Sequence, residues 1–226
     1  MLLANFTPCW APLGLDEPLS NLDAKLRAEM RLEIKSLVKS MGVTTLYVTH
    51  DQMEALTMSD WVAVMRDGVF VEAATPRDVY LRPHSAFTAT FLGETNLLAG
   101  QVVAGATADG ICQVETPHGC LVCPVQSGPE PVASVWVACR PEGVRVTACP
   151  PPGENVLRGR IVAAIFAGDQ MTYRVAIGDQ VLQAKSDPLS GFHDGDQVWV
   201  QLPPERCLLL RRGAETTTPN PTGAVV

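Results

Sequence analysis

Two adjacent carboxylates, Asp16 and Glu17, follow a short apolar stretch and could support chemistry on a phosphate group. An aspartate at a strand end can hold Mg²⁺, directly or through water, and a neighbouring glutamate can activate the water that attacks the phosphate. His50 ends a second apolar stretch and could donate a hydrogen bond to the same phosphate. Taken alone, the two carboxylates could instead form an acidic turn that caps the next helix, and the histidine could be structural.

The elements that would position these residues are indicated by the spacing of apolar side chains. Helical spacing over residues 24–41 predicts an amphipathic helix, with Asp23 as its N-cap and Gly42 as its stop. The stretch 43–50 is β-branched and apolar, and it predicts a short buried strand that ends at His50. The elements expected next are a helix, a hairpin and two short helices, at 51–60, 61–74, 75–83 and 84–93.

Beyond Gly93 the sequence changes to short β-rich runs separated by Gly, Pro and Asp, which predict small antiparallel barrels. The Pro-rich segment 149–155 is expected to divide this region in two. Each half begins with a similar strand, LAGQVV or LRGRIV, which suggests a duplication. We therefore expect an α/β part over 1–92, an all-β region of OB-like barrels over 93–212, and a disordered tail over 213–226.

Composition and charge argue against two classes of protein, namely nucleic-acid binders and proteins with membrane-spanning helices. The 226 residues are 46% hydrophobic and 18% charged with a net charge of −7, so the chain lacks the basic surface that a nucleic-acid partner requires. No apolar run approaches the roughly 18 residues of a membrane-spanning helix. The first residues are apolar, but they carry no Lys or Arg and contain Pro8 and Pro12, so they do not predict a signal peptide. Seven cysteines without such a signal suggest reduced thiols in the cytoplasm.

One group of potential metal ligands, His118, Cys120 and Cys123, lies within a predicted strand. The two cysteines are three positions apart and therefore point to opposite faces of the strand, and no second pair has the spacing of a zinc site. Buried thiols are the expected outcome.

An ordered series of short motifs resembles the C-terminal half of an ATP-binding cassette (ABC) importer ATPase. The series is LDEPLSNLDA, then VTHDQMEALTMSD, then DGVFVEAATPRDVYLRPHSAFTATFLGETN. Later residues, RPEGVRV and the strands up to 210, resemble the transport-associated OB (TOBE) domain of the sugar, polyamine and iron subgroup. The fold class that this resemblance implies is an α/β remnant of a P-loop ATPase domain followed by an OB-like β-barrel region.

The resemblance also implies a role for each matching residue. Asp16 would be the aspartate linked to Mg²⁺ through water, Glu17 the catalytic base, and His50 the switch histidine that contacts the γ-phosphate, with Asp51 following it. The D-loop, which crosses the dimer interface of such ATPases, would consist of Ser20, Asn21, Leu22 and Asp23.

The sequence departs from the family pattern in its phosphate-binding parts. It contains no G-x-x-x-x-G-K-[ST] motif, no Ser-Gly-Gly-Gln signature and no Gln-containing loop before it. Residues 1–14 also match poorly, because Pro12 and Gly14 interrupt the expected strand. ATP and Mg²⁺ are therefore expected cofactors of the complete family member, and we expect this chain alone to bind neither.

Three functions remain open at this point. The first is the ATP-binding, energy-coupling subunit of an importer for a polyamine, iron or a related small solute. Its partners would be membrane permease subunits and a second ATPase subunit at the inner face of the plasma membrane, with no nucleic acid. The second is a non-catalytic regulatory or dimerisation module of OB fold, and the third is a truncated, inactive remnant. The helix over 24–41 would lack strands to cover, so we expect exposed apolar surface unless it dimerises or repacks.

Overall fold

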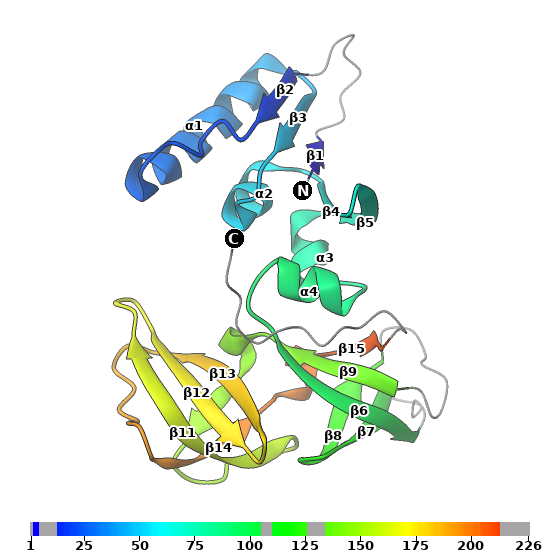
Figure 1. The fold of residues 1–226 in the computed structure, drawn as a ribbon, viewed down its shortest axis with the longest axis vertical. Coiled ribbons are helices and arrows are strands. Elements are labelled where there is room, and N and C mark those ends of the chain that lie inside the picture. The colour runs from blue at the N-terminus through cyan, green and yellow to red at the C-terminus, as the bar shows by residue number, and fades with distance from the viewer. Residues whose placement is uncertain (1, 5–12, 105–109, 126–133, 213–226) are drawn as a thin grey trace. The chain divides into compact units, whose positions relative to one another are not determined.

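The computed structural model describes residues 2–4, 13–104, 110–125 and 134–212. The chain divides into two compact units, Met1–Gly93 and Glu94–Val226 (Figure 1). The expected tail over 213–226 lies outside the described residues. No helix of the described part has the length and apolar character needed to cross a membrane.

The long helix of the first unit, α1, forms where the apolar spacing predicted it, at Ala24–Met41. The Asp23 carboxylate accepts hydrogen bonds from the backbone N–H groups of Lys25 and Leu26, which would otherwise lack partners at a helix start. The helix ends at Gly42, whose φ of 61° is a left-handed conformation that glycine adopts without a steric cost. The predicted bounds, N-cap and stop of this helix are confirmed.

The first unit contains one five-stranded sheet in the order β2-β3-β1-β4-β5. Its strands are β1 (Leu2–Ala4), β2 (Leu13–Asp16), β3 (Thr45–Val48), β4 (Val62–Arg66) and β5 (Val69–Ala74). Strands β2 and β3 are parallel, and β1 pairs antiparallel with both β3 and β4. A sheet without the strands of a P-loop half could leave one edge of β3 without a partner. The backbone of Leu2–Ala4 fills the position, so β3 has a neighbour on each side.

Three short helices complete the first unit, namely α2 (Gln52–Met58), α3 (Pro76–Leu81) and α4 (Ala86–Phe91). Side chains of Asp51, Thr75 and Ser85 cap their N-termini, so each helix begins one residue after a capping side chain. The core between helices and sheet is small. Its buried residues are Leu19, Tyr47, Ala55, Met58, Val62, Val64, Val79 and Leu92.

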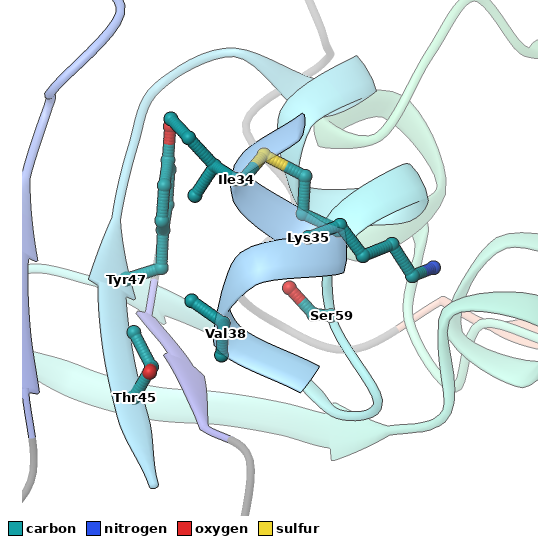
Figure 2. A pocket seen from close by; sticks show the side chains of 7 residues that line it. Ile34, Lys35, Val38, Thr45, Tyr47 and Ser59 are labelled. Atoms are coloured by element: carbon teal, nitrogen blue, oxygen red, sulfur yellow. The ribbon is translucent and has the colours of Figure 1, made fainter. Parts of the chain in front are cut away.

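Helix α1 contributes no fully buried residue to this core. Met30 and Ile34 pack against it, whereas four large apolar side chains of the helix are exposed: Leu26, Leu32, Leu37 and Met41. A small hollow of about 30 Å³ lies between α1, β3 and the end of α2. In Figure 2, Ile34 and Val38 face Tyr47 across this hollow, and Lys35 extends away from it. The expected exposure of apolar surface on this helix is confirmed.

The second unit is built from two five-stranded antiparallel sheets that form curled half-barrels (Figure 1). One has the order β15-β9-β6-β7-β8 and the other β10-β14-β11-β12-β13. The strands are β6 (Asn96–Ala104), β7 (Ile111–Thr116), β8 (Gly119–Pro124), β9 (Ser134–Cys139), β10 (Arg145–Thr147), β11 (Val156–Phe166), β12 (Met171–Ile177), β13 (Gln180–Ser186), β14 (Gln197–Gln201) and β15 (Cys207–Arg211). The expected fold class, α/β followed by OB-like β structure, is thereby observed.

The expected division of this region at 149–155 is wrong. Strand β10 precedes that segment but pairs with β14 in the second sheet, and β15 returns at the end to pair with β9 in the first. Prolines in 149–155 make it a connection, because they cannot donate to a sheet ladder. The position of this connection in the sequence therefore did not indicate which sheet β10 and β15 would join. Both sheets contribute residues to a single core.

The two similar strands noted in the sequence do have equivalent structural roles. In β6, a Cβ at Gly100 would lie 2.5 Å from Val114 Cγ1, and in β11 a Cβ at Gly159 would lie 2.6 Å from Val175 Cγ1. Either distance is a clash, so each glycine admits a valine of the next strand. This shared feature supports the duplication.

Candidate functional site

The candidate site lies where the parallel strands β2 and β3 end. Asp16 is opposite Val48 in the register, and the Glu17 backbone N–H continues the pairing by donating to the Val48 carbonyl at 2.8 Å. Because both strands run in the same direction, the residues that follow them emerge at one edge of the sheet. Glu17 Oε1 and His50 Nδ1 meet there at 2.8 Å. The structure thus brings together two residues that are 33 positions apart.

The backbone of Glu17 has an unusual conformation. Its φ of 44° lies in the left-handed region, which costs a non-glycine residue roughly 1–3 kcal/mol. The turn that follows is closed by the Ser20 N–H donating to the Glu17 carbonyl at 3.2 Å. Such conformations persist only where surrounding structure holds them, and they concentrate at functional sites.

The Glu17–His50 pair is accessible to solvent, with side-chain exposures of 45% and 70%. The hydrogen bond to Glu17, and next the negative charge of that carboxylate, raise the pKa of His50 above its ordinary value. This contact occupies Nδ1 of His50 and does not involve Nε2.

A buried network supports the turn that carries His50. Glu54 on α2 is 2% exposed and accepts hydrogen bonds from Tyr47 Oη at 3.0 Å and Thr49 Oγ1 at 2.8 Å. Thr49 Oγ1 in turn accepts from the Asp51 backbone N–H at 2.9 Å, which fixes the chain on both sides of His50. Burial, and next the hydrogen bond to Glu54, raise the pKa of Tyr47.

Two arginines of α1 connect that helix to the site. Arg31 Nη2 lies 2.7 Å from Asp51 Oδ2, and Arg27 Nη1 lies 3.6 Å from the same oxygen. Arg27 also donates to the Leu22 carbonyl at 2.8 Å. One guanidinium therefore links Asp51 to the turn that would be the D-loop.

The site residues expected from the sequence fall into two groups. Those that line a common hollow of about 20 Å³ are Glu17, Ser20, His50 and Asp51, together with Arg27, Thr49 and Glu54. The others are not part of its lining: Asp16 and Asn21 are exposed, Leu22 is half-buried, and Asp23 caps α1.

Sequence reasoning did not assign roles to Thr49, Glu54, Arg27 or Arg31. Two signals in the sequence could have indicated them. Thr49 and Glu54 are polar residues next to apolar core positions of β3 and α2, and such residues require buried partners. Arg27 and Arg31 are separated by one helical turn and therefore share a face of α1.

The described residues fit only part of a nucleotide site. Asp16 and Glu17 offer carboxylate oxygens, which Mg²⁺ prefers. A hollow of about 20 Å³ is, however, far smaller than the roughly 300–1,000 Å³ of ligand pockets. The geometry brings a carboxylate and an imidazole together at one exposed edge, and the described residues form no enclosure of the size that a nucleotide requires.

The potential metal group on β8 does not assemble. Cys123 is buried and Cys120 is exposed, which confirms that the two point to opposite faces. His118, whose side chain is 7% exposed, faces Asp179, with 3.7 Å between Nε2 and Oδ1. In the described ranges, no group of three or more His, Cys, Asp or Glu residues could hold a metal ion.

Comparison with known proteins finds one matching domain family and several relatives that share one name. The family model described as TOBE domain matches residues 137–210. The spermidine/putrescine import ATP-binding protein PotA of Pseudomonas fluorescens is 40% identical over 205 residues, which cover 88% of this chain and 55% of the relative. Proteins of the same name from Frankia alni and Acidothermus cellulolyticus are 38% and 36% identical, and the matches cover 88% and 92% of this chain and 46% and 55% of those relatives.

The chain spans about half the length of these curated relatives. Among solved structures, the cytoplasmic molybdate-binding protein ModG in its molybdate-bound form matches 51% of this chain and 95% of its own, with 12% identity and a TM-score of 0.46.

Proposed function

The chain corresponds to the C-terminal portion of PotA-like ABC importer ATP-binding proteins and contains a TOBE domain, and on this basis we propose that it forms part of a transport ATPase. Its contribution is the catalytic base and the switch histidine. The contact of 2.8 Å between Glu17 and His50, at the joint end of β2 and β3, is the observation that carries this proposal.

In the proposed mechanism, Glu17 accepts a proton from the water that attacks the γ-phosphate. His50 holds the Glu17 carboxylate through Nδ1 and directs Nε2 toward the phosphate. Asp16 contributes an oxygen for Mg²⁺, which would neutralise charge on the phosphates when bound. Residues that enclose the phosphates come from the other half of the ATPase, since the printed sequence has no P-loop.

The partners follow from the same proposal. The exposed apolar side chains of α1 are the surface that the remainder of the ATPase domain covers. Ser20 to Asp23 face a second ATPase subunit, and permease subunits in the plasma membrane receive the energy of hydrolysis. The solute is a polyamine such as spermidine or putrescine, as in the names of the relatives, in preference to iron or another small solute.

The test joins this chain to the half of a relative that it does not span. The N-terminal half of the Pseudomonas fluorescens relative is joined ahead of Leu15, and steady-state phosphate release is measured. Glu17→Gln should lower the turnover roughly 100-fold or more, because general-base catalysis supplies about that factor. His50→Ala should lower it as well. The matched controls are Glu33→Gln on the exposed side of α1 and His193→Ala in the second unit, which should retain activity.

Two results would contradict the proposal. Activity of the Glu17→Gln and His50→Ala chimeras equal to that of the controls would exclude these residues from catalysis. ATP hydrolysis by the 226-residue chain without the added half would show that the chain completes a nucleotide site by itself, provided that Glu17→Gln abolishes this activity.

A further inference from the structure

Four cysteines are buried together in the core of the second unit and are called here the thiol cluster. Each is at most 1% exposed, and each lies on a different strand of the sheet β15-β9-β6-β7-β8. The members are Cys112 on β7, Cys123 on β8, Cys139 on β9 and Cys207 on β15. The catalytic proposal does not involve any of these residues.

The strand register places two of these cysteines directly opposite each other. Cys139 and Cys207 are partners across the antiparallel strands β9 and β15. Opposed residues in an antiparallel pair have Cα atoms about 4.5 or 5.5 Å apart, depending on the hydrogen-bonding position. Both values fall within the roughly 4.4–6.8 Å that a disulfide spans, so the backbone separation permits a disulfide between these two cysteines.

Cys207 has polar neighbours, and its thiol donates a hydrogen bond to the Leu202 carbonyl, with 3.6 Å between sulfur and oxygen. Asn155 Nδ2 lies 3.9 Å from its sulfur. Hydrogen bonds from the thiols of Cys123 and Cys139, against the opposing effect of burial, lower the pKa of Cys207. Cys112 differs, since burial alone raises its pKa. Cys112 and Cys123 are likewise opposite each other across β7 and β8, and β8 is also an edge strand, so the experiment below has to distinguish the two pairs.

We propose that Cys139 and Cys207 are a redox-active dithiol that a small peroxide closes into a disulfide between β9 and β15. The Cys207 thiolate attacks hydrogen peroxide, so an S–O bond forms, the O–O bond breaks, and the leaving hydroxide takes up a proton to become water. The Cys139 sulfur then attacks the sulfenic acid on Cys207. An S–S bond forms, the S–O bond breaks, and the hydroxide leaves as water with the proton of the Cys139 thiol. The two sulfurs together lose two electrons, and the peroxide gains them.

Strand β15 gives the oxidant access to this buried pair. It is a five-residue edge strand whose one strand partner in the sheet order is β9. Edge strands near the end of a domain open locally with less free energy than the domain as a whole. Opening of β15 exposes Cys207 to peroxide, and the disulfide then closes a loop of about 70 residues and holds β15 in place.

The experiment uses the full chain with Cys9, Cys120 and Cys149 changed to serine, which removes the cysteines outside the thiol cluster. The protein is treated with one equivalent of hydrogen peroxide, alkylated and digested without reductant for mass spectrometry. One cross-linked peptide containing Cys139 and Cys207 is expected. The Tm of the oxidised protein should exceed that of the dithiothreitol-treated protein by roughly 5–15 °C.

Variants separate the alternatives. Cys112→Ala should keep both the cross-link and the Tm shift, whereas Cys139→Ala should lose both. If Cys139→Ala fails to fold, the peptide map of the parent protein still decides. The absence of a disulfide, a link from Cys123 to Cys207 or to Cys112, or an unchanged Tm after complete cross-linking would each overturn the proposal.

Discussion

The two units differ in how completely they bury their apolar side chains. Among the described residues, the core of the second unit contains 21 buried residues supplied by both sheets, whereas the core of the first contains eight. The 18-residue helix α1 has no buried residue at all. Both units expose some large apolar side chains, such as Phe166 and Leu189 in the second, but only the second unit has a large buried core, and the first leaves its longest helix without a buried residue.

The candidate site is in the unit with the smaller core. Its side chains are held by hydrogen bonds and ion pairs, such as those to Glu54 and Asp51, more than by packing. The local geometry of the Glu17–His50 contact thus occurs on a scaffold whose apolar faces are incompletely covered. We expect the first unit to be the less stable of the two when it is isolated.

The largest expected effect concerns the stability of each unit alone. A piece spanning 94–212 should unfold cooperatively on heating, because its strands and core are complete. The piece 1–93 should show no cooperative transition as a monomer, since its α1 face remains exposed. Circular dichroism melting of the two pieces, with size-exclusion chromatography to establish their oligomeric state, measures the difference. A cooperative transition of monomeric 1–93 would mean that this unit completes its own core.

A pair of leucines tests the same contrast within the full chain. Leu98→Ala removes a fully buried side chain of the second unit and should lower the free energy of unfolding by about 2–5 kcal/mol. Leu32→Ala on α1 removes a side chain that is 70% exposed and should change it by less than about 0.5 kcal/mol. Denaturant unfolding of both variants compares them. Equal losses would show that the exposed face of α1 is covered in solution.

Local features of the fold could be predicted because their causes are local. Asp23, Gly42 and the apolar spacing between them determine α1, since caps and periodicity depend on residues within a few positions. The turn Asp67-Gly68 likewise marks the hairpin of β4 and β5. The positions of Glu17 and His50 at one edge followed from a family resemblance, because no local spacing relates residues 33 positions apart.

The remaining features depend on non-local pairing. Residues 2–4 join β3 and β4 through backbone hydrogen bonds, which any sequence can make, so their side chains carry no signal of it. The return of β15 to β9 brings together Cys207 and Cys139 from distant parts of the chain. Burial of Glu54 depends on Tyr47 and Thr49, and charged residues are buried only where such partners converge.

Removal of one hydroxyl tests whether hydrogen bonds hold the first unit's site. Thr49→Val deletes the donor to Glu54 and the acceptor of the Asp51 N–H, and it should cost about 1–3 kcal/mol in the full chain. Thr57→Val is the matched control, because Thr57 Oγ1 bonds only to the Met53 carbonyl of its own helix in the described contacts. Hydrogen exchange of the backbone amides of the first unit, measured in the full chain, compares both variants, and equal effects would exclude a supporting role for Thr49.

The smallest expected effect is the pH dependence of the Glu17–His50 contact. Because Glu17 raises the pKa of His50 in the folded chain, NMR titration of the imidazole should give a midpoint above the ordinary value of about 6.5. In Glu17→Gln the midpoint should fall back toward that value.

A raised folded-state pKa means that the contact contributes stability fully below the unfolded pKa and loses it as the pH rises through the folded pKa. The stability difference between the native chain and Glu17→Gln should therefore shrink with increasing pH, and it should be small at any pH because solvent screens the exposed pair. Equal midpoints in the two proteins would show that Glu17 does not control His50.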